Sequence, residues 1–248
     1  IKKHNGDLFV DANVKKINVQ NNKATGVTLD NGDIIDAKTI ISSAGIVNTL
    51  QKFIKNNNSF NTSLLKKIKP TESYICLHIG INGTAEELGL EDTNFWVYPD
   101  YNHDKNVRNS LKSIDNKFPV VYISFPSVKD PSWDKEHPGK SAMEAITFSS
   151  ISWFDQWKDL DWKKRGQEYE NLKEELSNRL LDIVYKHAPS IKGKIEYFEL
   201  STPLSTRDLA NYSAGEMYGL EHGPDRFKQK WLKPKTPIKN LYLTGQDI

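Results

Sequence analysis

The chain has 248 residues, of which 37% are apolar and 27% are charged, and its net charge is +2. This composition is that of a globular domain and excludes a disordered chain, and charges spread along the sequence give no basis for a nucleic-acid partner. The longest apolar runs, such as residues 74–81, are far shorter than the roughly 20 residues that span a bilayer.

The two ends of the sequence resemble the interiors of structural elements. Residues 1–6 (IKKHNG) have the pattern of a last helical turn, with basic residues followed by a glycine that stops the helix. Residues 240–245 (NLYLTG) have the pattern of a strand that runs into a glycine turn. We therefore expect the chain to be an internal piece of a longer protein, and ordinary frayed termini are the alternative.

Residues 7–45 predict a β-meander. Residues 7–19 are interpreted as a strand pair, residues 21–23 as a turn and residues 24–29 as a further strand that contains Gly26. Asn31 and Gly32 predict a hairpin turn, after which Ile34 and Ile35 resume the hairpin. Residues 38–43 predict a short buried strand that ends at Ala44 and Gly45, so this region holds three or four strands followed by a buried one.

The middle of the chain alternates between helices and strands. We predict helices at residues 47–55 and 63–67, separated by a polar loop, and strands at residues 73–82, 95–98, 120–125 and 142–149. Residues 100–117 predict a polar connection, and the proline-containing segment 126–140 an irregular loop. Apolar residues at spacings of three and four predict a long amphipathic helix over residues 166–187.

The last part of the chain returns to strands. We predict a strand at residues 195–200, a helical or turn-like segment at 202–212 with Leu209 packed inward, and a final strand at 241–244. Because the first and last segments are of one kind and the middle is of another, we expect a middle domain inserted between two halves of a sheet domain. The predicted boundaries are 1–48, 49–195 and 196–248, in an α+β fold.

The chain has a single cysteine and six histidines. One cysteine excludes an intramolecular disulfide and a cysteine metal cluster. Cys76 and His78 lie in the apolar run 74–81, which predicts a buried structural thiol and a core histidine. The histidines show no metal-ligand spacing, so we predict no metal site.

Several segments resemble one family of proteins. Residues 14–17, 26–32 and 37–45 match the strand, Gly-Val, Asn-Gly and Ala-Gly pattern of the flavin amine oxidase and phytoene desaturase group. Residues 125–131 (FPSVKDP) and 215–222 (GEMYGLEH) resemble the branch that contains retinol saturase and carotenoid isomerase, as do residues 137–141 and 201–206. The longest match is residues 233–247 (KPKTPIKNLYLTGQD).

The chain thus resembles the FAD-dependent oxidoreductases of the phytoene desaturase, carotenoid isomerase and retinol saturase family. The resemblance implies an incomplete FAD/NAD(P)-binding, glutathione-reductase-like fold that is α/β in the intact protein, with an inserted mixed-sheet substrate domain. It assigns residues 1–48 and 196–248 to the FAD-binding domain and residues 49–195 to the substrate domain.

The resemblance also implies the positions of the cofactor-binding residues. The backbone of Val14 would hold the adenine ring, and the turn at Ala44 and Gly45 would pass close to the cofactor. The final turn, Gly245, Gln246 and Asp247, would pass the pyrophosphate and ribityl region, where Asp247 would meet a ribityl hydroxyl. For each position the simpler interpretation is structural: a core valine, a plain turn and a solvated surface aspartate.

One element of the family pattern is absent from this sequence. The family binds FAD at a strand, a G-x-G-x-x-G turn and a helix, where backbone N–H groups meet the pyrophosphate, and this chain contains no such motif. We therefore expect FAD in the intact protein but none bound by this chain alone, which we expect to be inactive. NAD(P) remains an alternative cofactor.

Tyr218 and Glu216 are the acid–base candidates that the resemblance places near the flavin. Their simpler interpretation is a packed Tyr218 and a solvated Glu216. The function that follows is saturation, desaturation or isomerisation of a long apolar polyene of carotenoid or retinoid type. The alternative is a non-catalytic lipid- or protein-binding module on a relict flavoprotein scaffold. We expect an apolar small-molecule partner, no nucleic acid, and a cytoplasmic or membrane-peripheral location.

Overall fold

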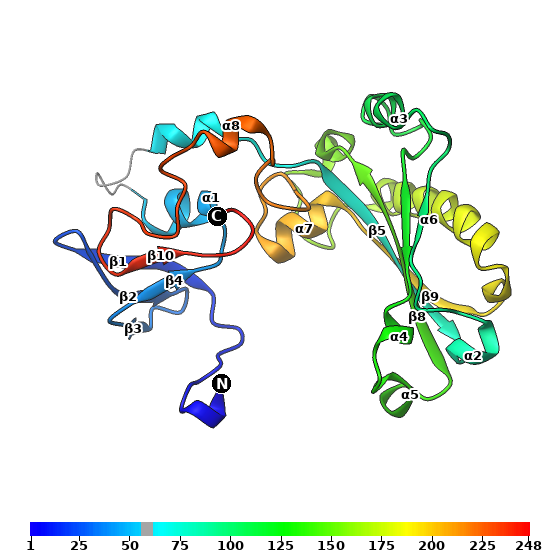
Figure 1. Ribbon diagram of the computed structural model, residues 1–248, viewed down its shortest axis with the longest axis horizontal. Coiled ribbons are helices and arrows are strands. Elements are labelled where there is room, and N and C mark those ends of the chain that lie inside the picture. Colours follow the sequence, from blue (N-terminus) through cyan, green and yellow to red (C-terminus); the bar gives the residue numbers. More distant parts are fainter. Residues whose placement is uncertain (56–61) are drawn as a thin grey trace. The chain divides into compact units, whose positions relative to one another are not determined.

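The computed structural model describes residues 1–55 and 62–248, drawn in Figure 1. The chain forms two compact units: unit 1 comprises residues 1–71 and 218–248, and unit 2 comprises residues 72–217. Unit 1 thus draws on both ends of the sequence, whereas unit 2 is one continuous stretch. The polar loop predicted after Lys55 lies outside the described residues.

Unit 1 contains a three-stranded antiparallel sheet in the order β1-β2-β3, from Val14–Gln20, Lys23–Leu29 and Ile34–Asp36. Asn21 and Asn22 both have positive φ angles, which suits the tight turn between β1 and β2. Gly26 lies where β3 approaches most closely, since an added Cβ would be 2.4 Å from the carbonyl oxygen of Ile35. The meander is therefore as predicted from residue 14 onward.

The strand pair predicted for residues 7–19 is wrong in its first half. Residues 7–13 form no strand, and β1 begins at Val14. Leu8, Phe9 and Val10 are at least 65% exposed. Their apolar and β-branched composition favours a strand, but composition alone cannot supply the partner strand that an extended segment needs.

Unit 1 also contains a two-stranded parallel sheet, in which β4 (Ile40–Ser42) pairs with β10 (Leu241–Leu243). Figure 1 shows β10, in red, beside β4, in blue, although the two lie near opposite ends of the sequence. After β4 the chain enters helix α1 (Ile46–Asn48), which continues as the π-helical turn η2 (Thr49–Phe53). Ile46 and Leu50 are 1% exposed and pack with Leu241 and Leu243 in the core of this unit.

Short helices complete unit 1: the 3₁₀ turns η1 (Lys2–His4) and η3 (Thr62–Lys67), and α8 (Pro224–Phe227). The opening turn ends at Asn5, which has a left-handed φ of 56°, and not at the predicted Gly6. Asparagine tolerates this conformation because its side chain can hydrogen-bond locally.

Unit 2 is built on a five-stranded sheet in the order β6-β7-β8-β5-β9. The strands are Phe95–Val97, Val121–Ser124, Lys140–Ser149, Ser73–Asn82 and Ile195–Ser201, given in that spatial order. Every neighbouring pair is antiparallel. The predicted mixed sheet is therefore an antiparallel one, a detail that strand patterns cannot decide because pairing direction depends on how the connections run.

The first face of this sheet forms the core of unit 2. Along β5, Ile75, Leu77, Ile79 and Ile81 are at most 2% exposed, and the residues between them point to the second face. Helix α6 (Gln167–His187) packs on this core through Leu176, Leu180 and Val184, none of which is measurably exposed. The long helix predicted from apolar periodicity is thus confirmed to within one residue at its start.

The connections of unit 2 carry the helices α2 (Ala85–Leu88), α3 (His103–Ser110), α4 (Pro126–Lys129), α5 (Trp133–Glu136) and α7 (Pro203–Ala210), and the 3₁₀ turns η4 (Ile151–Trp157) and η5 (Pro189–Ile191). Helix α3 lies inside the segment predicted as a polar connection. The sequence does not predict this helix because only Ser110 of its residues is buried, so it has no apolar stripe. Leu209 on α7, predicted to pack inward, is 69% exposed.

The units divide at residues 71/72 and 217/218, whereas the sequence placed the boundaries at 48/49 and 195/196. Strand β9 belongs to unit 2 because it pairs with β5 along its length. Residues 49–54 belong to unit 1 because Leu50 and Ile54 lie in that unit's core. None of the helices in the described part of the chain is both long and apolar enough to cross a membrane.

Candidate functional site

The turns that follow β4 and β10 lie together in unit 1. Because β4 and β10 are parallel and in register from Ile40 and Leu241, their carboxyl ends meet at one edge. The chain leaves that edge through Gly45 (φ 82°) and Gly245 (φ 102°), both in conformations that favour glycine. An added Cβ at Gly245 would meet nothing closer than the carbonyl oxygen of Ser43, at 3.8 Å.

These two turns are accessible from outside unit 1. Ala44, Gly245 and Gln246 are exposed, and Gly45 is half-buried. Open α/β sheets bind their ligands in the crevice beyond the carboxyl ends of parallel strands, where backbone can approach a phosphate closely. Open space at the positive-φ Gly245 would let a dinucleotide such as FAD approach the backbone at this edge, so the geometry of the turn is compatible with that group.

Asp247 holds three segments of unit 1 together. It is 4% exposed, and its Oδ2 accepts a hydrogen bond from the backbone N–H of Ile46 at 2.8 Å. Its Oδ1 accepts one from the backbone N–H of Leu220 at 3.1 Å. Gly219 makes room for this carboxylate, because an added Cβ would lie 2.1 Å from Oδ1. Asp247 is thus not a solvated surface aspartate, and its carboxylate is not directed at open space. It links the turn after β10 to Ile46 and Leu220 through hydrogen bonds to their backbone N–H groups.

Arg226 stabilises the same region, and no sequence motif indicates this role. Its guanidinium donates from Nη2 to the carbonyl oxygen of Gln246 at 2.8 Å, and from Nη1 to that of Leu220 at 3.2 Å. The contact joins helix α8 to the turn after β10. A single arginine on a four-residue helix carries no pattern that distinguishes it from a solvated charge.

The other predicted residues belong to other elements of the chain. Val14 begins β1 in the three-stranded sheet, half-buried and opposite Leu29. Glu216 belongs to unit 2 and Tyr218 to unit 1. Of the predicted set, the structure therefore brings together Ala44 and Gly45 with Gly245, Gln246 and Asp247.

The environments of Glu216 and Tyr218 are the reverse of their simpler interpretations. Glu216 is buried, at 7% exposure, and its Oε2 accepts a hydrogen bond from the N–H of Ala214 at 2.9 Å. Tyr218 is 56% exposed, and its backbone N–H donates to Thr71 Oγ1. A solvated Glu216 and a packed Tyr218 are thus both wrong.

The second face of the sheet in unit 2 carries a polar cluster of Cys76, His78, Glu144 and Ser201. His78 Nδ1 lies 3.1 Å from Glu144 Oε1 and 3.8 Å from Cys76 Sγ, and its Nε2 lies 3.2 Å from Ser201 Oγ. The His78 side chain is 45% exposed, so the predicted core histidine is wrong, while Cys76 is buried as predicted.

The cluster perturbs the acidity of two of its members. Burial, and then the charge of Glu144, raise the pKa of the Cys76 thiol to about 12. The hydrogen bond from His78 lowers the pKa of Glu144 against the opposing effect of burial. At neutral pH the cluster therefore holds a protonated thiol beside an ionised carboxylate.

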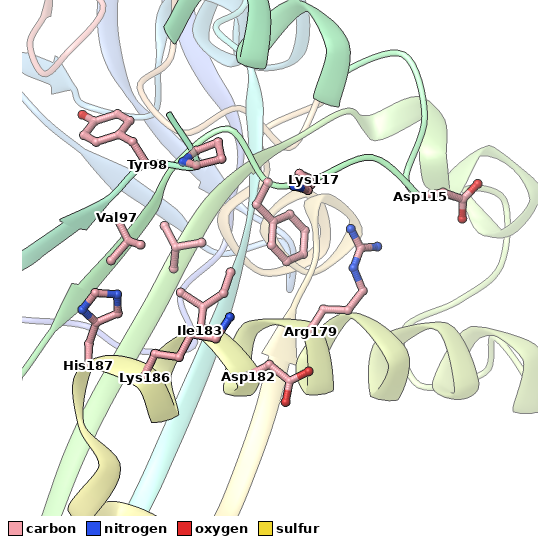
Figure 2. A pocket seen from close by; sticks show the side chains of 12 residues that line it. Val97, Tyr98, Asp115, Lys117, Arg179, Asp182, Ile183, Lys186 and His187 are labelled. Carbon is pink, nitrogen blue, oxygen red and sulfur yellow. The ribbon is translucent and has the colours of Figure 1, made fainter. Parts of the chain in front are cut away.

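An open pocket of about 440 Å³ lies in unit 2 between helix α6 and the end of β6. Figure 2 shows Arg179, Ile183 and His187 along α6 on one side of it and Val97 and Tyr98 on the other. Arg179 donates to the carbonyl oxygens of Ile114 and Asn116 and lies over the ring of Phe118. The guanidinium of Arg179 thus stabilises the loop that contains Ile114 and Asn116. None of the site residues predicted from the sequence lines this pocket.

Comparison with known proteins places the whole chain beside two groups of enzymes. The chain is 34% identical to all-trans-retinol 13,14-reductase of Danio rerio over 100% of its length, which covers 43% of that protein. It is 26% identical to a chloroplastic prolycopene isomerase of Daucus carota over 96% of its length, which covers 36% of that protein. The chain therefore spans less than half the length of these relatives. No protein-family profile matches it.

A solved structure shares the fold. Cyclohexylamine oxidase from Brevibacterium oxydans IH-35A superposes on 96% of the chain with a TM-score of 0.50 at 14% identity, and the match covers 43% of that oxidase. At this identity the likeness concerns the fold alone. The chain thus shares an α+β fold with the matched part of that structure.

Proposed function

We propose that this chain, which is homologous over its whole length to all-trans-retinol 13,14-reductases and prolycopene isomerases, forms part of a flavin-dependent oxidoreductase acting on a long apolar polyene. The observation that carries the proposal is the 34% identity with the Danio rerio reductase along the entire chain. Residues 1–71 and 218–248 would contribute to the FAD-binding part, and residues 72–217 to the substrate-binding part.

In this proposal the cofactor lies at the edge where β4 and β10 end. Gly45 and Gly245 would let the backbone approach it, and Ala44 and Gln246 would border it, because all four lie on the accessible turns. Val14 would contribute backbone groups from β1. Asp247 is assigned to positioning, since both of its carboxylate oxygens accept hydrogen bonds from backbone N–H groups within unit 1.

A bound flavin supplies hydride transfer to or from a polyene carbon. The residues of this chain hold the site in shape: Asp247 fixes the starts of α1 and of the segment at Leu220, and Arg226 fixes the carbonyl groups of Leu220 and Gln246. Tyr218, with an exposed hydroxyl-bearing ring, remains the acid–base candidate of unit 1. Glu216, buried beside Ala214, is better suited to holding its own loop.

On the second face of the sheet in unit 2, the side chains beside the polar cluster, on β6, β7 and β8, would supply an apolar surface for the substrate. Trp96 is 61% exposed and its ring centre lies 4.7 Å from that of Tyr122 on the neighbouring strand. Ile146 lies opposite Tyr122 in the next strand pairing and therefore on the same face. Aromatic and aliphatic side chains on a rigid sheet favour contact with an extended hydrocarbon. A lipid-soluble substrate implies peripheral association with a membrane.

The test uses the full-length protein that contains this chain. We expect the purified protein to show a flavin absorbance spectrum and to convert all-trans-retinol or prolycopene, as followed by chromatography. The Gly245→Val variant should bind flavin at least about tenfold more weakly. A branched side chain would enter the space beside the turn, and valine is strained at a positive φ angle.

Gly32→Val is the matched control, because Gly32 also has a positive φ and open space around it but lies in the β2–β3 hairpin. It should retain the flavin. A full-length protein without flavin would reject the oxidoreductase and favour the non-catalytic binding module. Flavin that survives Gly245→Val would reject the proposed cofactor edge, and bound flavin without conversion of either polyene would reject the substrate class.

A further inference from the structure

The cluster on the second face of unit 2 has a donor set that the proposed flavin chemistry does not use. Cys76 and His78 are two residues apart on β5, so both side chains point to the same face. Glu144 lies directly opposite His78 in the antiparallel pairing of β5 with β8. A thiol, an imidazole and a carboxylate therefore converge from two adjacent strands.

The distances within the cluster suit a metal ion. The Sγ, Nδ1 and carboxylate oxygen atoms all lie within 4.8 Å of one another. Zinc bonds of about 2.3 Å to sulfur and about 2.0–2.1 Å to nitrogen or oxygen, at tetrahedral angles, place ligand atoms roughly 3.3–3.6 Å apart. The observed separations of 3.8 Å from Sγ to Nδ1 and 3.1 Å from Nδ1 to Oε1 lie on either side of that range.

The surroundings of the three donors hold them in place. Leu77 and Ala145, their neighbours along β5 and β8, are not measurably exposed, so the backbone that carries the donors is anchored in the core. Strand β5 lies between β8 and β9 and is hydrogen-bonded on both sides. Sites built on paired strands are held more accurately than sites on loops.

The second nitrogen of His78 has the partner that a metal-bound histidine requires. Nε2 lies 3.2 Å from Ser201 Oγ, on the strand at the other side of β5. With Nδ1 bound to a metal ion, Nε2 carries the proton and donates a hydrogen bond to Ser201 Oγ. This hydrogen bond orients the imidazole ring. A thiolate and a carboxylate together balance the charge of a divalent cation in this half-buried site.

We propose that Cys76, His78 and Glu144 form a binding site for a divalent cation of the zinc type, with Ser201 orienting His78 and a fourth position open to water or another ligand. Thiolate and imidazole donors favour zinc and its borderline-soft neighbours over magnesium or calcium. Binding replaces the thiol proton by the metal ion and releases that proton to solvent, so no oxidant or reductant takes part.

The test is a Co²⁺ titration of the metal-free chain, followed by absorbance. Cys76 is the only cysteine in the sequence, so a thiolate-to-cobalt charge-transfer band can come from no other side chain. We expect this band together with the visible bands of tetrahedral cobalt, and we expect Zn²⁺ to displace both. Cys76→Ser should abolish the charge-transfer band.

Glu144→Gln and His78→Gln should each weaken Co²⁺ binding by at least tenfold, and Ser201→Ala by roughly tenfold, since residues that orient metal ligands are worth about 10–100-fold. His187→Gln, an exposed histidine of the same unit, should change nothing. Glu144 and His78 are partly exposed, so their variants test the site without the loss of stability that a substitution at the buried Cys76 brings. No thiolate band, or a band indifferent to Glu144→Gln and His78→Gln, overturns the proposal.

Discussion

At the scale of single residues, Asp247 determines the geometry of the proposed cofactor edge. A carboxylate at 4% exposure needs hydrogen-bond donors around it, and it takes them from the backbone of Ile46 and Leu220. One of these contacts satisfies the backbone N–H of Ile46 at the start of α1. The N-cap residue of this helix, Gly45, has no side chain that could accept a hydrogen bond there. Asp247 therefore links the chain end, the first helix and the segment after Tyr218.

We predict that Asp247→Asn destabilises unit 1 by about 1–3 kcal/mol. Whichever way the amide lies, its NH₂ group faces a backbone N–H, so one buried donor loses its acceptor. Hydrogen exchange should show faster exchange at Ile46 or Leu220, and urea unfolding should report the lost stability. Asp225→Asn is the control, because the Asp225 side chain is 83% exposed. Equal effects of the two variants would show that Asp247 is no brace.

At the scale of elements, an ion pair fastens helix α6 to the edge strand β9. Lys173 Nζ donates to Glu199 Oε1 and also lies 3.5 Å from Glu170. For Glu199, burial favours a raised pKa, but the hydrogen bond and charge of Lys173 outweigh it and the pKa is lowered. For Lys173, burial opposes the same partners, and the pKa is raised. Both shifts stabilise the folded state in the pH range between the lowered pKa of Glu199 and the raised pKa of Lys173.

The sign of the pH dependence follows from the lowered pKa of Glu199. Its stabilisation is present above the ordinary value of 4.5 and is lost as the pH falls through the lowered pKa. Because the Glu199 side chain is 48% exposed, we expect about 0.5 kcal/mol. Unfolding free energies measured between pH 7 and acid should fall less steeply in Glu199→Gln than in the unchanged protein.

Glu175→Gln on the exposed side of α6 is the matched control for that measurement. It removes one carboxylate from the same helix without touching Lys173. If Glu175→Gln reduced the loss of unfolding free energy at acid pH as much as Glu199→Gln does, the net charge of the protein and not this ion pair would account for the pH dependence.

At the scale of the whole molecule, unit 2 has what an independent domain requires. It is one continuous stretch, residues 72–217, and it has its own core, in which Leu176, Leu180 and Val184 of α6 cover the sheet. Unit 1 is assembled from two segments of sequence, and its parallel pair leaves Ile41 66% exposed and Tyr242 38% exposed. Parallel sheets are normally covered on both faces, so unit 1 is the less self-sufficient of the two.

We predict that residues 72–217 fold alone and unfold cooperatively in urea. Leu180→Ala, at a site without measurable exposure, should cost about 2–5 kcal/mol through the lost contacts and the cavity. The cost should be the same in residues 72–217 as in the whole chain. A non-cooperative transition with dye-binding apolar surface, or a cost that differs between the two, would contradict the independence of unit 2.

Local patterns predicted most of the elements but few of the site's contacts. The strand predicted at residues 73–82 is confirmed, and the helix predicted at 166–187 is confirmed to within one residue at its start. The helix could be predicted because burial of one face leaves a period in the sequence. Helix α3 was missed because it buries only Ser110. The segment from Leu8 to Val10 was misassigned because apolar residues without a partner strand remain exposed coil.

The sequence by itself determined the order of the elements and, through motifs such as residues 233–247, the resemblance to polyene oxidoreductases. The tertiary structure alone decided that Asp247 binds backbone amides, that Glu216 is buried and Tyr218 exposed, and that Glu144 joins Cys76 and His78. The physical reason is range: a helix or strand records its period in neighbouring residues, whereas these contacts depend on which distant strands pair and in what register.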